Sequence, residues 1–308
     1  MKRFISILLA LVFLLCCVSS ALAEDDEENY ETGDASLDLI RNEDDIGEKE
    51  LMVVSFGTSY NDSRRLTIGG IEKAIDDAVD EYSVRRSFTA QIIIDHVESR
   101  DGIHIDNVEE ALDRAVNNGV KILVVQPTHL MHGFEYDELI ETLAGYADAF
   151  DQIVVAEPLL TSEDDFDRVA DIMINLLKDY DDGQTAIVYM GHGTEHEYNK
   201  IYAQMQDILA SKGAANYYVG TVEAEPSIDD VLSAIADKNY TRVVLRDMMV
   251  VAGDHANNDM AGDEEDSWKS IFSAAGYEVE CVLEGLGQVP EIQQIYVEHT
   301  LSAISQVG

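Results

Sequence analysis

Short apolar runs alternate with longer amphipathic stretches from residue 50 to the end of the chain. The runs are rich in β-branched residues and have the length of strands, and the stretches between them carry apolar residues at helical spacing. Eight strands are expected, at residues 51–56, 90–95, 121–126, 152–156, 186–190, 217–222, 242–246 and 278–283. Nearly continuous apolar strands suit burial on both faces, so the alternation predicts an α/β fold of parallel sheets covered by helices on both sides.

The order of these segments repeats along the chain. The first strand runs into Gly57-Thr58 and the fifth into Gly193-Thr194, and a helical pattern follows each. This predicts two similar four-stranded halves, residues 50–184 and 185–285, followed by a helix in 286–308 that packs back on the first half. Ligands of open α/β sheets bind beyond the carboxyl ends of the strands, so the active site is expected in a cleft between the halves.

The first residues have the features of a secretory signal peptide. Lys2 and Arg3 precede an apolar run over residues 4–18, and small residues follow as far as Ala23. This order predicts cleavage after Ala23, removal of residues 1–23 and export to the periplasm. The apolar run is shorter than the ~20 residues that a membrane-spanning helix needs, so no membrane span is expected in the processed chain.

Acidic residues dominate the segment that follows. Residues 24–49 are crowded with Asp and Glu and show no sustained period, which predicts a disordered acidic leader that acts as a passive tether. The whole chain has 61 acidic and 20 basic residues, a formal net charge of -41. Nucleic acid is therefore not an expected partner, because phosphate backbones are bound by basic surfaces.

Two histidines follow the fifth strand. His192 lies between Gly191 and Gly193, which let the backbone turn sharply and let a ligand approach the imidazole. A histidine in this position is expected to be functional. His196 follows at a spacing that is common in helical zinc sites, but the sequence around it does not have the His-Glu-x-x-His pattern. His196 is therefore the weaker candidate.

Two further strand ends carry metal-binding residue types. His255 follows the seventh strand in a polar loop, where Asp254 or Asn257 is expected to orient the imidazole. Glu223 and Glu225 follow the sixth strand, and either carboxylate would reach the same cleft. Two imidazoles and one carboxylate from three strand ends suit a divalent transition metal.

Several of these segments also carry a family resemblance. They are residues 55–59, 126–129, 191–194, 221–224 and 248–260. Together they resemble the anaerobic sirohydrochlorin cobaltochelatases, which are class II chelatases, and the likeness extends over the chain from residue 50 onward. The resemblance implies two α/β halves with a tetrapyrrole cleft between them. It also implies that His192 accepts protons and that His192, Glu223 and His255 bind the metal.

The resemblance implies a reaction in which Co²⁺, or alternatively Fe²⁺, enters a sirohydrochlorin-type tetrapyrrole. The substrate carboxylates would need local donors, for which Arg64, Arg65 and Arg246 are candidates. Imidazole and carboxylate accept cobalt and iron alike, and the sequence leaves a homo-oligomer open. The rival hypotheses are a non-catalytic periplasmic carrier of metal or tetrapyrrole, which the export signal favours, and a metallohydrolase, which lacks a recognisable nucleophile.

Overall fold

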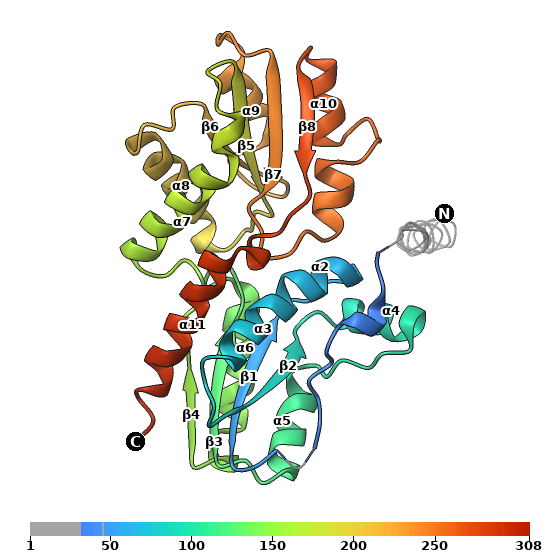
Figure 1. Ribbon diagram of the computed structural model, residues 1–308, viewed down its shortest axis with the longest axis vertical. Coiled ribbons are helices and arrows are strands. Elements are labelled where there is room, and N and C mark those ends of the chain that lie inside the picture. The colour runs from blue at the N-terminus through green and yellow to red at the C-terminus, as the bar shows by residue number, and fades with distance from the viewer. Residues whose placement is uncertain (1–31, 45) are drawn as a thin grey trace, which may run out of the picture. The chain divides into compact units, whose positions relative to one another are not determined.

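The computed structural model describes residues 32–44 and 46–308, which build two four-stranded sheets (Figure 1). The first sheet contains β1 (Lys49–Ser55), β2 (Ser83–Phe88), β3 (Ile122–Pro127) and β4 (Gln152–Val155), in the order β2-β1-β3-β4. The second contains β5 (Thr185–Gly191), β6 (Tyr217–Thr221), β7 (Arg242–Asp247) and β8 (Glu278–Val282), in the order β6-β5-β7-β8. Neighbouring strands are parallel throughout. The predicted fold class is confirmed, and the shared strand order shows the internal repeat.

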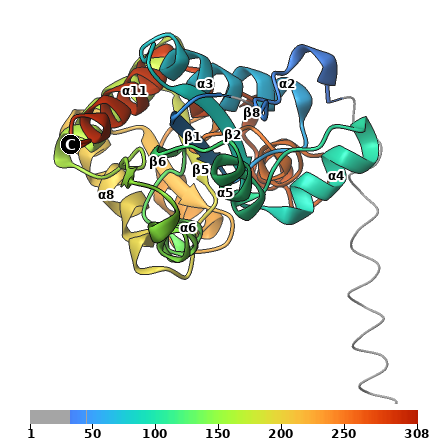
Figure 2. The same cartoon turned by 90° about the horizontal axis from the view of Figure 1, so that it is seen from below.

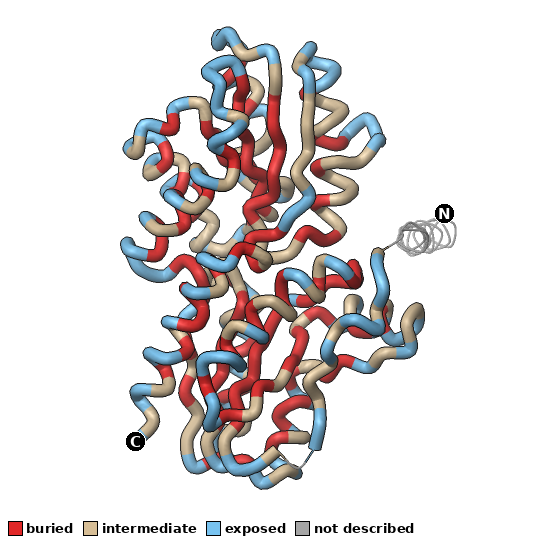
Figure 3. Tube along the Cα trace, in the orientation of Figure 1, coloured by how far each residue is buried: buried red, intermediate tan, exposed pale blue. Residues whose placement is uncertain are grey.

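Helices connect the strands and cover the sheets, so that the strands are largely buried (Figure 3). They are α2 (Asn61–Leu66), α3 (Ile68–Asp76), α4 (Gln91–Asp101), α5 (Val108–Asn117), α6 (Phe134–Gly145), α7 (Glu163–Leu177), α8 (Lys200–Ser211), α9 (Ile228–Ile235), α10 (Trp268–Ala274) and α11 (Pro290–Ile304). Capping boxes begin α5, α7 and α9, because Asn107, Ser162 and Ser227 each exchange hydrogen bonds with an acidic residue three positions on. Within residues 32–44 and 46–308, no helix has the length and apolarity that crossing a bilayer requires.

Each sheet buries apolar side chains on both faces. Successive residues of a strand point to opposite sides, so Leu51 and Val53 pack with α3 and α11, whereas Met52 and Val54 pack with α5 and α6. Figure 2 shows α3 and α11 on one side of β1 and α5 and α6 on the other. Full burial of one such side chain contributes about 1.5–3 kcal/mol. The core on the α3 side continues into the second half, where it includes Tyr189 of β5. The halves therefore share part of one core.

Two helices are exchanged between the halves (Figure 1). α7 follows β4 in the chain but packs against α8, and the hydroxyl of Tyr189 in β5 donates to the carbonyl of Met173 in α7 at 2.7 Å. α11 follows β8 but packs against α3 and β3, and Thr300 donates to Gln126 Oε1 at 2.8 Å. The segment expected to form the first half, 50–184, thus includes a helix that covers the second sheet.

The second strand is not where the apolar pattern placed it. Residues 90–95 lie at the start of α4, and β2 is formed by Ser83–Phe88 instead. β2 is an edge strand and contains Arg85 and Arg86. Arg86 is buried because its charge is paired with carboxylates, which an apolar pattern does not register.

Residues 34–44, which we call the N-terminal strap, pack against the first half and do not form the disordered leader expected there. The amide of Arg86 donates to the carbonyl of Arg41 at 3.2 Å, and Ser83 Oγ donates to the carbonyl of Ile46 at 2.7 Å. The chain therefore runs along the free edge of β2, an edge that natural proteins usually cover. The predicted signal peptide, residues 1–23, and leader residues 24–31 lie outside the described part of the chain.

Candidate metal centre

The three predicted ligands follow three neighbouring strands of the second sheet. His192 comes directly after β5, Glu223 lies two residues after β6, and His255 precedes η6 (Ala256–Met260), a π-helical turn beyond β7. β5 lies between β6 and β7, and the carboxyl ends of parallel strands share one edge of the sheet. The amide of Glu223 donates to the carbonyl of His192 at 2.8 Å, which joins the first two loops. Both histidines thus belong to the second half.

The ligand atoms converge on one point. One nitrogen of each imidazole and one carboxylate oxygen of Glu223 lie within 4.8 Å of one another. The two imidazole rings are nearly perpendicular, at 84°, with centroids 4.6 Å apart. The exposed fractions of the side chains are 45% for His192, 55% for Glu223 and 31% for His255. The group can therefore hold one divalent ion and leave positions open for a further ligand.

Hydrogen bonds of the two imidazoles indicate which ring nitrogen of each keeps a lone pair. His192 Nδ1 lies 2.6 Å from the carbonyl oxygen of Gly193, and His255 Nδ1 lies 2.7 Å from Asp259 Oδ2. Carbonyl and carboxylate oxygens accept, so each Nδ1 donates and each Nε2 keeps a lone pair for a metal ion or a proton. The hydrogen bond from His255 to Asp259 raises the pKa of His255. Asp259 therefore makes this imidazole a more basic ligand.

The glycines on either side of His192 are required by packing and by backbone conformation. A β-carbon at Gly191 would lie 2.2 Å from a ring carbon of Tyr202, closer than any real contact. Gly193 has a φ of +85°, a conformation that other residues rarely adopt. Its amide donates to the hydroxyl of Tyr202 at 3.3 Å. The loop can therefore present His192 only with glycine at both positions.

The alternative ligands lie apart from this group. Glu225 accepts a hydrogen bond from the amide of Ser227 at 3.1 Å, at the start of α9. His196 accepts from the amide of Tyr198 at 3.3 Å, and its ring packs edge-on against Phe134 with centroids 4.8 Å apart. The structure brings His192, Glu223 and His255 together and gives Glu225 and His196 other partners.

We expect the two carboxylates after β6 to differ sharply in their effect on metal binding. Glu223→Gln should lower the Co²⁺ affinity by roughly tenfold or more, because loss of a ligand costs at least as much as loss of a residue that only orients a ligand. Glu225→Gln should leave the affinity unchanged, because that side chain accepts from the amide of Ser227 and lies outside the group of ligands. Isothermal titration of both variants with Co²⁺ checks this. A larger loss in Glu225→Gln would show that the wrong carboxylate has been assigned.

Asp259 is the orienting residue that the sequence did not identify. The expectation for Asp254 and Asn257 is wrong, since Asp254 accepts from Asn258 Nδ2 at 2.5 Å and Asn257 donates to the carbonyl of Gly253 at 2.7 Å. Asp259 lies four residues after His255, which places both side chains on one side of a helical turn. This spacing is the signal that would have identified it.

Removal of the Asp259 carboxylate should weaken metal binding without removing a ligand. We expect Asp259→Ala to reduce Co²⁺ affinity by roughly 10–100-fold, the usual effect of losing a carboxylate that orients a metal-binding histidine. Asp254→Ala is the matched control, because it removes a neighbouring carboxylate whose partner is Asn258. Equal affinities of the two variants in a Co²⁺ titration would exclude an orienting role for Asp259.

The arginines expected to bind substrate carboxylates have other roles. Arg64 is fully buried, and the side chain of Arg246 is 2% exposed and pairs with Glu284 at 3.1 Å. The expectation is wrong for these two, because a buried guanidinium does not reach a ligand in solution. Arg65 is partly exposed and pairs with Asp62 at 3.1 Å, and it remains the candidate of the three.

A second group of potential ligands lies near the start of α5. His104, Asp106 and Glu110 each offer one atom within 4.8 Å of the others. Both oxygens of Asp106 accept from Arg114, at 2.6 and 3.0 Å, and Glu110 Oε2 accepts from the amide of Asn107 at 3.0 Å. A cation would have to compete with these bonds and with the charge of Arg114. The group after β5, β6 and β7 is therefore the better metal centre.

The part of the chain that contains this centre matches a known protein family. The family model described as cobalt chelatase (CbiK) matches residues 49–305, which include both sheets. The chain belongs to the cobalt chelatase family. A member from Salmonella typhimurium, a sirohydrochlorin cobaltochelatase, is 33% identical over 257 residues, which are 83% of this chain and 97% of that protein. Sirohydrochlorin cobaltochelatase CbiKC from Nitratidesulfovibrio vulgaris is 27% identical over 259 residues, covering 83% and 91%.

Solved structures share the fold at low sequence identity. SirB from Bacillus subtilis with Fe3+ aligns over 83% of this chain and 96% of its own, with a TM-score of 0.59 and 11% identity. CbiX, the terminal enzyme of siroheme biosynthesis in denitrifying bacteria, aligns over 83% and 99%, with a TM-score of 0.53 and 16% identity. These likenesses support the family's fold of two α/β halves.

Proposed function

We propose that this chelatase inserts Co²⁺ into a sirohydrochlorin-type tetrapyrrole. The observation that carries the proposal is the metal centre, in which two oriented imidazoles and one carboxylate converge in a member of the cobalt chelatase family. The two relatives from Salmonella typhimurium and Nitratidesulfovibrio vulgaris are both named sirohydrochlorin cobaltochelatases. The family therefore supports the substrate class and the metal, and the geometry of the centre supports the proposed residue roles.

Insertion replaces two pyrrole N–H protons of the macrocycle with one divalent ion. His192 Nε2 has a free lone pair because Nδ1 donates to the carbonyl of Gly193. A neutral imidazole is a suitable base near neutral pH, so His192 is the proposed proton acceptor. Both protons leave to solvent after transfer, and the two nitrogens that lose them become ligands of the ion.

Presentation of the ion is assigned to His192, Glu223 and His255 together. The three side chains are partly exposed, so a hydrated ion can enter and can exchange waters for pyrrole nitrogens. Because the centre has only three protein ligands and leaves coordination positions open, the ion can leave with the macrocycle. Iron is the alternative metal, since imidazole and carboxylate accept both ions and the SirB structure contains Fe3+.

We propose that the macrocycle lies between this centre and the loop after β1. Thr58 Oγ1 in that loop lies 3.2 Å from the position that a β-carbon at Gly253 would occupy, and Gly253 is two residues before His255. Phe56 begins the same loop and is 47% exposed, although it is large and apolar. A flat macrocycle over the ligands would contact this loop of the first half.

Turnover distinguishes the chelatase from a carrier. Purified protein incubated with excess sirohydrochlorin and Co²⁺ should change the absorbance spectrum through many equivalents and faster than a sample without protein. A change that stops after one equivalent would support a non-catalytic carrier of metal or tetrapyrrole. A rate equal to that of the protein-free sample would refute the proposed activity.

We further propose that the protein is exported. The proposal rests on the basic, apolar and small-residue order of residues 1–23, with cleavage after Ala23. Fractionation of cells followed by N-terminal sequencing tests it. Recovery of the uncleaved chain in the cytoplasm would contradict export.

A further inference from the structure

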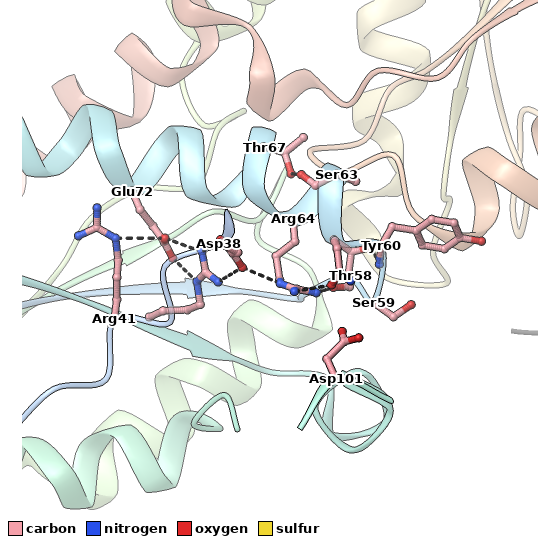
Figure 4. A network of polar contacts seen from close by, with 12 residues as sticks. Asp38, Arg41, Thr58, Ser59, Tyr60, Ser63, Arg64, Thr67, Glu72 and Asp101 are labelled. Atoms are coloured by element: carbon pink, nitrogen blue, oxygen red, sulfur yellow. Dashed lines mark hydrogen bonds and ion pairs between the residues drawn. The ribbon is translucent and has the colours of Figure 1, made fainter. Parts of the chain in front are cut away.

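A row of buried charges links the N-terminal strap to the first half (Figure 4). Asp38 accepts from Arg64 Nε at 2.7 Å and from both terminal nitrogens of Arg86, at 2.6 and 3.1 Å. Arg86 also donates to both oxygens of Glu72, each at 2.7 Å. These four side chains are at most 5% exposed. Charged hydrogen bonds of this kind are strong and directional, so the row holds its members in fixed positions.

Arg64 extends this row to the loop after β1. Its Nη1 donates to the carbonyl of Thr58 at 3.2 Å, and its Nη2 donates to Asn61 Oδ1 at 2.6 Å (Figure 4). Arg100 from α4 donates to the carbonyl of Ser59 at 2.6 Å. Two guanidinium groups thus hold successive carbonyls of the loop that borders the metal centre. The strap supplies the carboxylate that orients one of them.

We propose that Asp38 is a positioning residue for the tetrapyrrole: through Arg64 it holds residues 56–60 at the distance from the metal centre that the macrocycle requires. The inference rests on the proposed function, because it assigns this loop to the substrate of the same site. It gives the strap a part in substrate binding, although the strap itself lies on the far side of Arg64.

The negative charge of Asp38 neutralises the guanidinium groups of Arg64 and Arg86 in the row. Burial acts to raise the pKa of Asp38, but hydrogen bonds and charges of Arg86 and Arg64 outweigh it and hold the pKa below its ordinary value. The carboxylate is therefore ionised at neutral pH. Without it, Glu72 would be the only carboxylate of the row left for the two buried guanidinium groups, and Arg64 would lose the charged hydrogen bond that holds its Nε.

The test compares Asp38→Asn with Asp76→Asn. Asp76 pairs with Arg41 at 3.2 Å at the outer end of the strap, and it is half exposed. Asp38→Asn should raise the KM for sirohydrochlorin, and the dissociation constant for the metal-free macrocycle, by roughly tenfold, because the loop is misplaced. The Co²⁺ affinity of the metal centre should be unchanged. Amide hydrogen exchange in residues 56–60 should accelerate, and Asp76→Asn should match the wild type in every measurement.

Several results would overturn the inference. A lower kcat with unchanged KM would show only a loss of folded enzyme, and unchanged exchange in residues 56–60 would show that Asp38 does not hold the loop. Arg64→Gln should have the same effect as Asp38→Asn, and the double variant should add little, so additive effects would contradict action through Arg64. Wild-type protein without turnover refutes the proposed function instead, whereas an active wild type with an unaffected Asp38→Asn variant refutes only this inference.

Discussion

His192→Ala is expected to lower the rate of cobalt insertion by roughly 10²–10⁴-fold, the contribution of a positioned base, and to weaken Co²⁺ binding as well. The substitution removes the imidazole whose Nε2 is free to accept a pyrrole proton. The fold should survive, because the side chain is 45% exposed and lies beyond the end of β5. Initial rates at saturating Co²⁺ and sirohydrochlorin, together with a melting curve, measure both effects.

His196→Ala is the matched control for this prediction. It removes an imidazole from the same loop, four residues on, where the ring contacts Phe134 and Tyr198. We expect this variant to keep most of the wild-type rate. Wild-type turnover by His192→Ala would exclude His192 as the base. A larger loss of rate in His196→Ala would show that His196, and not His192, is the functional histidine of this loop.

Loss of the N-terminal strap is expected to destabilise the protein by about 3–5 kcal/mol, the usual cost of leaving buried charges without a partner. A chain that begins at Asp34 keeps Asp38, whereas a chain that begins at Gly47 leaves Arg64 and Arg86 without it. The shorter chain should melt at a temperature lower by on the order of 10 °C. Equal melting temperatures of the two chains would show that the strap contributes no stability, as the tether interpretation of the sequence requires.

The strap and β2 were missed for the same reason. The apolar pattern favoured residues 90–95 as the second strand, because Ser83–Phe88 contains Arg85 and Arg86 where a strand would normally present apolar residues. The acidic strap gave no pattern at all. The strap and β2 depend on each other, because Arg86 of β2 is buried by its pairing with Asp38 of the strap and with Glu72. Pairing between charges 48 positions apart is not visible in local periodicity.

The residues of the candidate metal centre were easier to predict, because each is marked locally. His192 is flanked by glycines directly after a buried strand, and Glu223 and His255 follow the strands on either side. Parallel strand order then brings the three together. The choice of Asp259 over Asp254 depended on the π-helical turn after His255, whose geometry the sequence did not specify.

The exchange of α7 and α11 gives the repeat a particular symmetry. The helix that follows the fourth strand of each half covers the sheet of the other half, so the exchange is reciprocal. Two copies of a half-length chain would make the same contacts in an isologous, domain-swapped dimer related by a two-fold axis. The chain therefore has the architecture of such a dimer fused end to end through the segment between α7 and β5. The two halves of this architecture differ in what they carry: the second holds His192, Glu223 and His255, and the first holds the strap and the loop after β1.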